Sequence, residues 1–236
     1  MHLRGMSGRL SSTLSNDFLR AFFRTDDDAP AFSPCWNLAP GHDARVVRRR
    51  NPEDGIRGLA TLRWGLLPHF TKNPATALRP SVAPAEILTS SPIFCDAYQR
   101  RRCLVPAELF YEWQVVQGGV QPHAVARLDG APLALGGIWE GWLSPLGEPI
   151  RSFALVTTAA NADMRPLSDR MPLVVQAEDW PTWLGETRAD PGSLLQPAPD
   201  GMLMPWPVSN RVDILLNNDV TLSAPVQRPR SLNDGA

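Results

Sequence analysis

The chain has 236 residues, a formal net charge of −1 and 43% hydrophobic residues, which suits one large globular domain or two small ones. It contains no run of 18 or more apolar residues, and its first residues lack an apolar core after their charges, so the sequence supports neither a membrane span nor a signal peptide. A chain this close to neutral is not a general binder of polyanions, and any nucleic-acid surface must be a local patch.

Short elements are predicted along the chain. Leu14, Phe18, Ala21 and Phe22 recur at helical spacing after a polar start at residues 11–13 and predict one amphipathic helix. Strand-like runs follow at residues 59–64, 103–105, 110–115, 133–139, 153–158 and 173–175. Residues 178–184 predict a short helix whose tryptophans pack on the sheet. The 24 prolines favour short strands and fixed loops, and no linker divides the chain, so we expect one α+β domain.

Cysteine and histidine usage indicates a reduced protein without metal. Cys35, Cys95 and Cys103 are odd in number and lack close pairing, so we expect reduced, buried side chains in a cytoplasmic protein. The four histidines are scattered without ligand spacing. We therefore expect neither a metal site nor a cofactor.

Glu112 is the first candidate site residue. It lies between Tyr111 and Trp113 near the end of a predicted strand, where its carboxyl should be partly desolvated and so suited to proton transfer near neutral pH. The alternative is a glutamate that pairs with a nearby arginine for structural reasons.

A second informative segment covers residues 166–175. It places the polar triplet Ser168, Asp169 and Arg170 between Pro166 and Pro172, just before an apolar run. Because proline fixes the backbone on either side, the triplet should be presented by a rigid loop.

These segments belong to a longer series of blocks. In chain order the blocks are Met6-Ser7-Gly8-Arg9, Trp36 to Gly41, Arg63 to Pro68, Phe110-Tyr111-Glu112-Trp113, Gly137 to Glu140, Thr157 to Asn161, Asp169-Arg170-Met171-Pro172 and Pro207-Val208-Ser209. In this order they resemble the SRAP family (SOS response-associated peptidase), whose members sense abasic sites. The resemblance spans residues 6–226, which we take as the domain. Residues 1–5 are then an extension or an incorrectly assigned start, and residues 227–236 a disordered tail.

The resemblance implies a barrel-like core of mostly antiparallel strands with a few short helices, and a reaction with abasic sites in single-stranded DNA. In that family an N-terminal cysteine, exposed by removal of the initiator methionine, joins the ring-opened sugar aldehyde through its amine and thiol in a thiazolidine. An asparagine orients the reacting groups, a glutamate handles protons and a histidine assists ring opening.

The chain departs from this pattern at most reactive positions. Ser7 stands at the cysteine position, Ser168 at the histidine position and Val82 at the asparagine position, and only Glu112 is kept. An arginine of the family motif is replaced by Pro84. These assignments assume a count without gaps back from Glu112.

Neither a register shift nor a nearby side chain clearly restores the lost groups. A shift of one residue places Ser81 or Ala83 at the asparagine position, and neither supplies the amide. His42 or His69 could stand in for the histidine, and Glu86 or Asp169 for proton transfer.

A serine hydroxyl is a weak nucleophile and cannot replace the thiol. The α-amine, with a pKa of about 7.7 to 8.0, could still form an imine. This requires that translation starts at Met6 and that Ser7 is exposed, because a start at Met1 would place Ser7 within the chain.

Binding to DNA can outlast catalysis. The resemblance places Arg9 and Arg170 where they could reach phosphates, and Asn37 and Thr157 on the same DNA-binding surface. Phe70 lies where an aromatic ring would stack on bases, at roughly 1 to 3 kcal/mol per base, or it packs in the core. The runs Arg48–Arg50 and Arg100–Arg102 are either solvated strand ends or turns, or a contact surface.

We therefore expect a divergent, monomeric SRAP protein that binds single-stranded DNA, with its thiol crosslinking and self-processing peptidase activities lost or reduced to a reversible Ser7 imine. One alternative is a non-catalytic module for single-stranded DNA. Another is a protein-binding scaffold, which would be supported if Arg9 and Arg170 were paired with carboxylates and Phe70 were buried.

Overall fold

The structure is a computed structural model that describes residues 8–26, 32–50 and 55–226. Ser7, the alternative starts and the predicted tail at residues 227–236 lie outside the described residues, so the expectations about them stay predictions.

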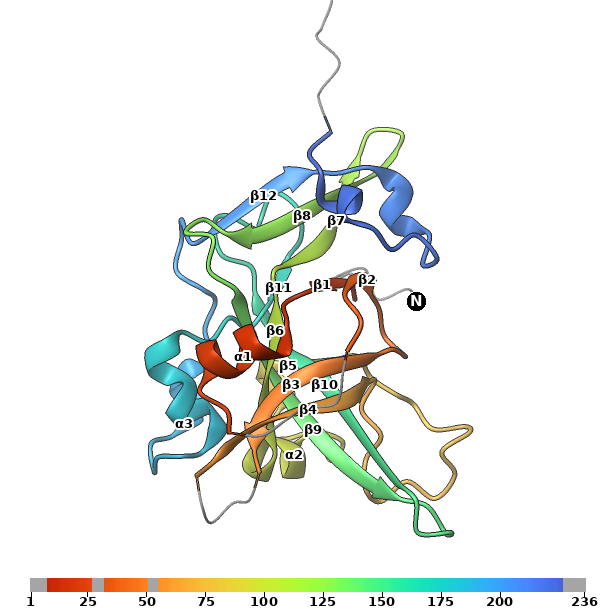
Figure 1. The fold of residues 1–236 in the computed structure, drawn as a ribbon, viewed down its shortest axis with the longest axis vertical. Helices are drawn as coiled ribbons and strands as arrows, with labels where there is room; N and C mark the ends of the chain where they lie inside the picture. The colour runs from red at the N-terminus through yellow and green to blue at the C-terminus, as the bar shows by residue number, and fades with distance from the viewer. Residues whose placement is uncertain (1–7, 27–31, 51–54, 227–236) are drawn as a thin grey trace, which may run out of the picture.

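Five strands close into a barrel (Figure 1). These strands are β3 (Asp43–Arg49), β4 (Arg57–Trp64), β6 (Arg102–Ala107), β9 (Leu133–Leu143) and β10 (Pro149–Ala159). Their order is β10-β4-β3-β6-β9, and β9 pairs again with β10. The β10–β4 pair is parallel and the other four pairs are antiparallel. The short strands β5 (Val82–Pro84) and β11 (Arg170–Pro172) also pair with β10.

A second sheet leaves the barrel where β6 passes into β7. Its antiparallel order is β12-β8-β7-β1-β2. The strands are β1 (Leu10–Ser12), β2 (Cys35–Leu38), β7 (Leu109–Val116), β8 (Gly119–Arg127) and β12 (Leu203–Pro207). In Figure 1 this sheet forms the upper part of the molecule.

The helices are short and lie outside the barrel, mainly at its lower end in Figure 1. They are α1 (Asn16–Phe23), α2 (Cys95–Arg100) and α3 (Trp180–Leu184), with 3-10 turns at residues 85–87, 177–179, 191–194, 210–213 and 220–223. The predicted α+β class, barrel-like core and few short helices are confirmed.

The first helix forms where it was predicted, but with a different buried face. Ser15 caps it by accepting a hydrogen bond from the Phe18 N–H. Leu19 and Phe23 are buried, and Phe23 stacks on Trp180 at 4.6 Å between ring centroids. Phe18, expected on the apolar stripe, is 42% exposed, because the contact with α3 selects the face one residue further along.

Two other local expectations need correction. The predicted strand at residues 173–175 starts earlier, as β11, while Val174 makes only an isolated bridge to Leu135. Leu173 and Val175 donate backbone hydrogen bonds to β10 and β9, so tertiary contacts shift the strand.

Of the three cysteines, only Cys103 is buried, whereas Cys35 and Cys95 are half-buried and all are free thiols. Within the described ranges, the longest apolar helices fall short of the length needed to cross a membrane.

Candidate functional site

Glu112 lies on β7 and is 4% exposed. Its Oε1 accepts a hydrogen bond of 3.1 Å from the Trp113 N–H. The register of the β7–β8 hairpin places His123 directly opposite Glu112, so the two side chains share one face of the sheet. Burial lowers the pKa of His123, against the effect of the Gln121 carbonyl that its Nδ1 approaches at 3.1 Å. A carboxylate and an imidazole favoured in its neutral form are thus neighbours.

Arg9 and Asn37 lie beside this strand. Arg9 Nη1 donates to Asn37 Oδ1 at 2.9 Å and to the Val212 carbonyl at 2.7 Å, and its guanidinium lies 6.0 Å from the Trp113 ring centroid. Burial lowers the pKa of Arg9, and the Asp213 charge opposes that effect.

Asn37 is 1% exposed, and its amide nitrogen donates to three carbonyls in the segment 212–217. Asn37 therefore positions Arg9 and this segment, and its amide is fully used within the protein.

A second group gathers at the end of β10. The Arg170 guanidinium forms a two-pronged ion pair with Glu86, at 2.6 and 3.0 Å, and donates to the carbonyl and hydroxyl of Thr157 at 2.7 and 2.9 Å. The hydrogen bonds from Arg170 lower the pKa of Glu86. Thr157 is 2% exposed, so its two hydrogen bonds hold the Arg170 guanidinium from the buried side.

Three replaced positions lie in described residues near this second group: Val82, Pro84 and Ser168. Val82 is half-buried on β5, which pairs with β10 so that Pro84 lies opposite Thr157. Ser168 is half-buried, and its Oγ accepts from the Arg170 N–H at 3.3 Å. Val82 thus lies beside Leu155 on β10, and Arg170 and Ser168 lie at the end of the same strand, where Arg170 pairs with Ala159.

The two groups are connected through Gln114, whose Nε2 donates to the Pro166 carbonyl at 2.9 Å. This bond ties β7, two residues beyond Glu112, to the loop that carries Ser168. The strand that carries Glu112 and the loop that carries Ser168 are therefore in direct contact, whereas Ser7 lies outside the described part of the chain.

Gly8, the residue after Ser7, is closely packed. A Cβ atom there would lie 2.6 Å from Pro40 Cγ and 3.6 Å from the Trp64 ring, so the position accepts no side chain. A cavity of about 430 Å³ adjoins this contact. Its lining is Pro40, Gly41, Arg63, Trp64, Gly65, Arg79 and Ile150. This cavity could not be found from the sequence, because its walls come from four separate segments.

Phe70 is 54% exposed and contacts the His69 ring edge-on at 5.4 Å between centroids. Core packing, the alternative for this residue, is therefore wrong. The scaffold alternative required Arg9 and Arg170 to pair with carboxylates and Phe70 to be buried. Arg170 does pair with the Glu86 carboxylate, the hydrogen bonds of Arg9 go to Asn37 and to the Val212 carbonyl, and Phe70 is not buried.

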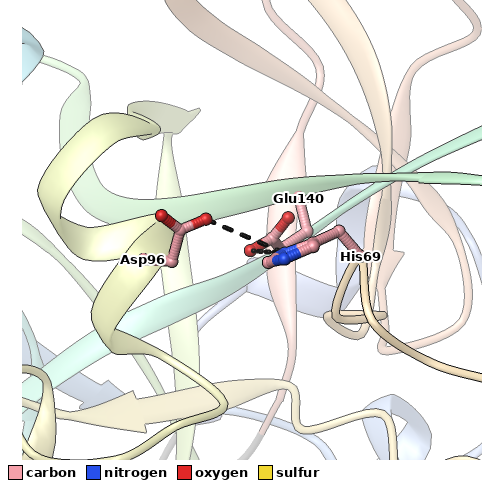
Figure 2. A group of neighbouring side chains, drawn as sticks. All are labelled: His69, Asp96 and Glu140. Carbon is pink, nitrogen blue, oxygen red and sulfur yellow. Dashed lines mark hydrogen bonds and ion pairs between the residues drawn. The ribbon is translucent and has the colours of Figure 1, made fainter.

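His69 belongs to a separate cluster with Asp96 and Glu140 (Figure 2). Its Nδ1 lies 3.7 Å from Asp96 Oδ2 and 3.4 Å from Glu140 Oε1. Arg101 Nη2 donates to the same two oxygens, at 2.8 Å to Glu140. These oxygens already face a guanidinium, so the cluster balances its charge without an ion.

The cluster is distant from Ser168. Glu140 lies opposite Ser152 on β10, and Thr157 is five residues further along, which corresponds to about 17 Å. His69 is therefore not placed to stand in for the replaced histidine.

The family profile described as SOS response associated peptidase (SRAP) matches residues 6–214. The chain belongs to the SRAP family. It is 30% identical over 224 residues to the abasic site processing protein YoqW of Bacillus subtilis (strain 168), covering 92% of this chain and 98% of YoqW. It is 23% identical over 214 residues to the abasic site processing protein HMCES of Xenopus tropicalis, covering 74% of this chain and 64% of HMCES.

Solved structures show the same SRAP fold. A protein from Bacteroides thetaiotaomicron superposes with a TM-score of 0.84 at 20% identity, covering 94% of this chain and all of that one. A protein from Bordetella bronchiseptica gives a TM-score of 0.74 at 25% identity, covering 86% of this chain and all of that one.

Sequence reasoning identified the SRAP motifs but missed some of the surrounding groups. Glu86 was considered only as a proton carrier, whereas it is the ion-pair partner of Arg170. His123 was set aside as scattered. Its position opposite Glu112 could have been found by counting outward from the Gln117-Gly118 turn of the hairpin.

Proposed function

We propose that this protein acts on abasic sites in single-stranded DNA, as a divergent SRAP member whose remaining chemistry is a reversible imine at the Ser7 amine. The names of its relatives support the substrate class. The observation that carries the chemical part is Glu112, which is buried beside His123 and tied through Gln114 to the loop of Ser168 and Arg170. A buried carboxylate in this position can transfer protons while water leaves during imine formation.

The proposed step is balanced without a cofactor. The Ser7 amine adds to C1 of the ring-opened deoxyribose aldehyde, and the resulting carbinolamine loses water to give the C=N bond. A thiol would then close a thiazolidine ring, whereas the serine hydroxyl is a poor nucleophile at that carbon. The imine therefore stays open to hydrolysis, in which water breaks the C=N bond and returns the amine and the intact aldehyde. Strand cleavage requires a further β-elimination, in which a base takes a C2′ proton, the C3′–O bond breaks and the 3′ phosphate leaves with the downstream strand.

The test is a denaturing gel of the protein, started at Met1 or at Met6, mixed with abasic single-stranded DNA with and without borohydride. Borohydride reduces the C=N bond and traps the complex. We expect a trapped band only from the Met6 form and only with borohydride. Glu112→Gln should weaken the band at least about tenfold, in line with the usual contribution of a general acid or base.

Ser7→Cys in the Met6 form is the matched positive variant, because it restores the thiol without changing size greatly. We expect it to form some complex that persists without borohydride. No band from either start, with Ser7→Cys equally silent, would overturn the imine proposal.

A second candidate is non-catalytic binding of single-stranded DNA. The exposed Phe70 ring favours it, because an exposed aromatic ring can stack on a base whatever the chemistry at Ser7. It predicts binding of undamaged single strands that weakens with salt and with Phe70→Ala, without any trapped product.

A further inference from the structure

The two arginine runs of the sequence meet at one end of the barrel. The β3–β6 register pairs Val47 with Leu104 and Arg48 with Cys103, so the next step places Arg49 beside Arg102. Like charges directly opposite on neighbouring strands destabilise a sheet. The fold therefore holds two positive charges, those of Arg49 and Arg102, next to each other. Their repulsion must be offset by other groups.

The compensation within the protein comes from carbonyl groups. Arg49 Nη1 donates to the Gly185 carbonyl, and Arg102 donates to the carbonyls of Trp183, Tyr98 and Gln99. Across the described residues, neither guanidinium forms an ion pair with a carboxylate within 4 Å. Burial lowers the pKa of Arg102, and the Arg49 charge lowers it further, against the opposing effects of Tyr98 and of the Asp190 charge. Both side chains are thus held by carbonyl groups, and within the described residues neither guanidinium is in direct contact with a carboxylate.

A cavity of about 350 Å³ opens around this pair. Its lining, which we call the arginine pocket, consists of Arg48, Arg49, Arg50, Arg100, Arg101, Arg102, Trp139 and Leu184. The Arg48 guanidinium lies over the Trp139 ring at 4.8 Å from its centroid. The buried Nε atoms of Arg49 and Arg101 have no hydrogen-bond partner. Among the described residues the lining contains no acidic side chain, although Asp96 and Glu140 neutralise one end through Arg100 and Arg101.

We propose that the arginine pocket is a binding site for a phosphate group, carried by a nucleotide or by a nucleic-acid backbone. Phosphate fits because it offers several acceptor oxygens in the geometry that guanidinium forks match. An anion between Arg49 and Arg102 would also remove their mutual repulsion. The pocket is distinct from the Glu112 site. Its lining residues come mainly from the ends of β3, α2 and α3. These elements lie in the lower part of Figure 1, whereas β7 and β8 lie above.

The first measurement is calorimetric titration of the full chain with inorganic pyrophosphate, at low salt, for the native protein and three variants. Arg49→Gln removes a charge from the centre of the pocket and should weaken binding at least about tenfold, the size expected for a charge-assisted hydrogen bond. Arg100→Gln, whose side chain is 73% exposed, should weaken it about twofold. Arg151→Gln, an exposed change of the same charge on β10 outside the lining, should leave it unchanged.

Two ligands distinguish the source of the phosphate. Titration with a deoxynucleoside diphosphate and with oligothymidylate lacking abasic sites should show the same dependence on Arg49, and the tighter of the two identifies the natural carrier. No binding of any phosphate ligand by the native protein, or equal weakening by Arg49→Gln and Arg151→Gln, would overturn the proposal. If Arg49→Gln fails to fold, the comparison of Arg100→Gln with Arg151→Gln tests the proposal, because only Arg100→Gln should weaken pyrophosphate binding.

The proposal stands apart from abasic-site chemistry. Arg49→Gln should leave the borohydride-trapped band of the Met6 form unchanged when short abasic DNA is used at saturating concentration. If the native protein gives the trapped band but does not bind pyrophosphate, the arginine-pocket proposal fails and the proposed imine chemistry stands. If it binds pyrophosphate but gives no band, the imine proposal fails and the arginine pocket stands.

Discussion

At Gly8 the chain passes too close to Pro40 to allow even one methyl group. The residue therefore fixes how the chain approaches the Glu112 region, directly after the position where the family chemistry begins.

Gly8→Ala should destabilise the fold by about 1 to 3 kcal/mol, the usual cost of an added methyl group in a packed site. Gly141→Ala is the control, because a Cβ atom there meets nothing within 4 Å, and alanine in a compatible strand position is neutral or slightly stabilising. Urea unfolding of both variants measures the difference. Equal midpoints would mean that the contact with Pro40 relaxes without cost.

The Glu86–Arg170 pair gives a pH dependence of stability. Arg170 lowers the pKa of Glu86 in the folded state, so the pair stabilises the fold fully above the unfolded pKa, near 4.5. The stabilisation is lost as the pH falls through the lower folded pKa. Glu86→Gln should therefore differ from the native protein in unfolding free energy above pH 5, and the difference should be smaller at pH 3, below the unfolded pKa.

Urea unfolding at both pH values checks this, with Glu148→Gln, a change on an exposed turn, as the control. A constant difference between Glu86→Gln and the native protein across the range would contradict the linkage.

At the scale of elements, packing rather than pattern decides which face of α1 is used. Phe23 is fully buried against Trp180, whereas Phe18 on the same helix is 42% exposed and stacks only on Phe22. Phe23→Ala should cost about 3 to 5 kcal/mol, and Phe18→Ala under about 1 kcal/mol. Thermal and urea unfolding of the two variants compare them directly. Similar losses would show that α1 does not depend on α3.

Long β-branched and aromatic runs made the central strands predictable. β4, β6, β7, β9 and β10 were all expected, because their apolar residues are buried by neighbours on the barrel. β12 was missed because it contains Pro205 and Pro207, and proline normally argues against a strand. Proline is tolerated in β12 because this strand lies at the edge of its sheet. β1 and β2 were missed because they are too short to show alternation.

The candidate site was predictable in part. Glu112, Ser168 and Arg170 were found by their motifs, whereas the ion pair of Arg170 and the cavity beside Gly8 depend on residues brought together from separate strands. The arginine runs show the same limit, because each alone looks like a solvated strand end and only the β3–β6 register unites them.

For the whole molecule, closure of the barrel predicts a gradient of local stability. β9 and β10 pair with each other over seven positions and with other strands on their far sides, while β12 is an edge strand of the second sheet. In native-state hydrogen exchange, amides of β9 and β10 should exchange only by global unfolding, and those of β12 at lower free energy. Equal protection in β12 and β10 would mean that both sheets open as one unit.

The parallel pairing of β4 with β10 also sets an order of events at the ribosome. β4 ends at Trp64, β9 ends at Leu143 and β10 begins at Pro149, so during synthesis β4 waits for β10 for a time on the order of ten seconds, and β9 for about one second. Until then the nascent chain holds two unpaired strand edges, which invite pairing with other chains. Biogenesis of this protein should therefore be most vulnerable to aggregation just before residue 159 leaves the exit tunnel.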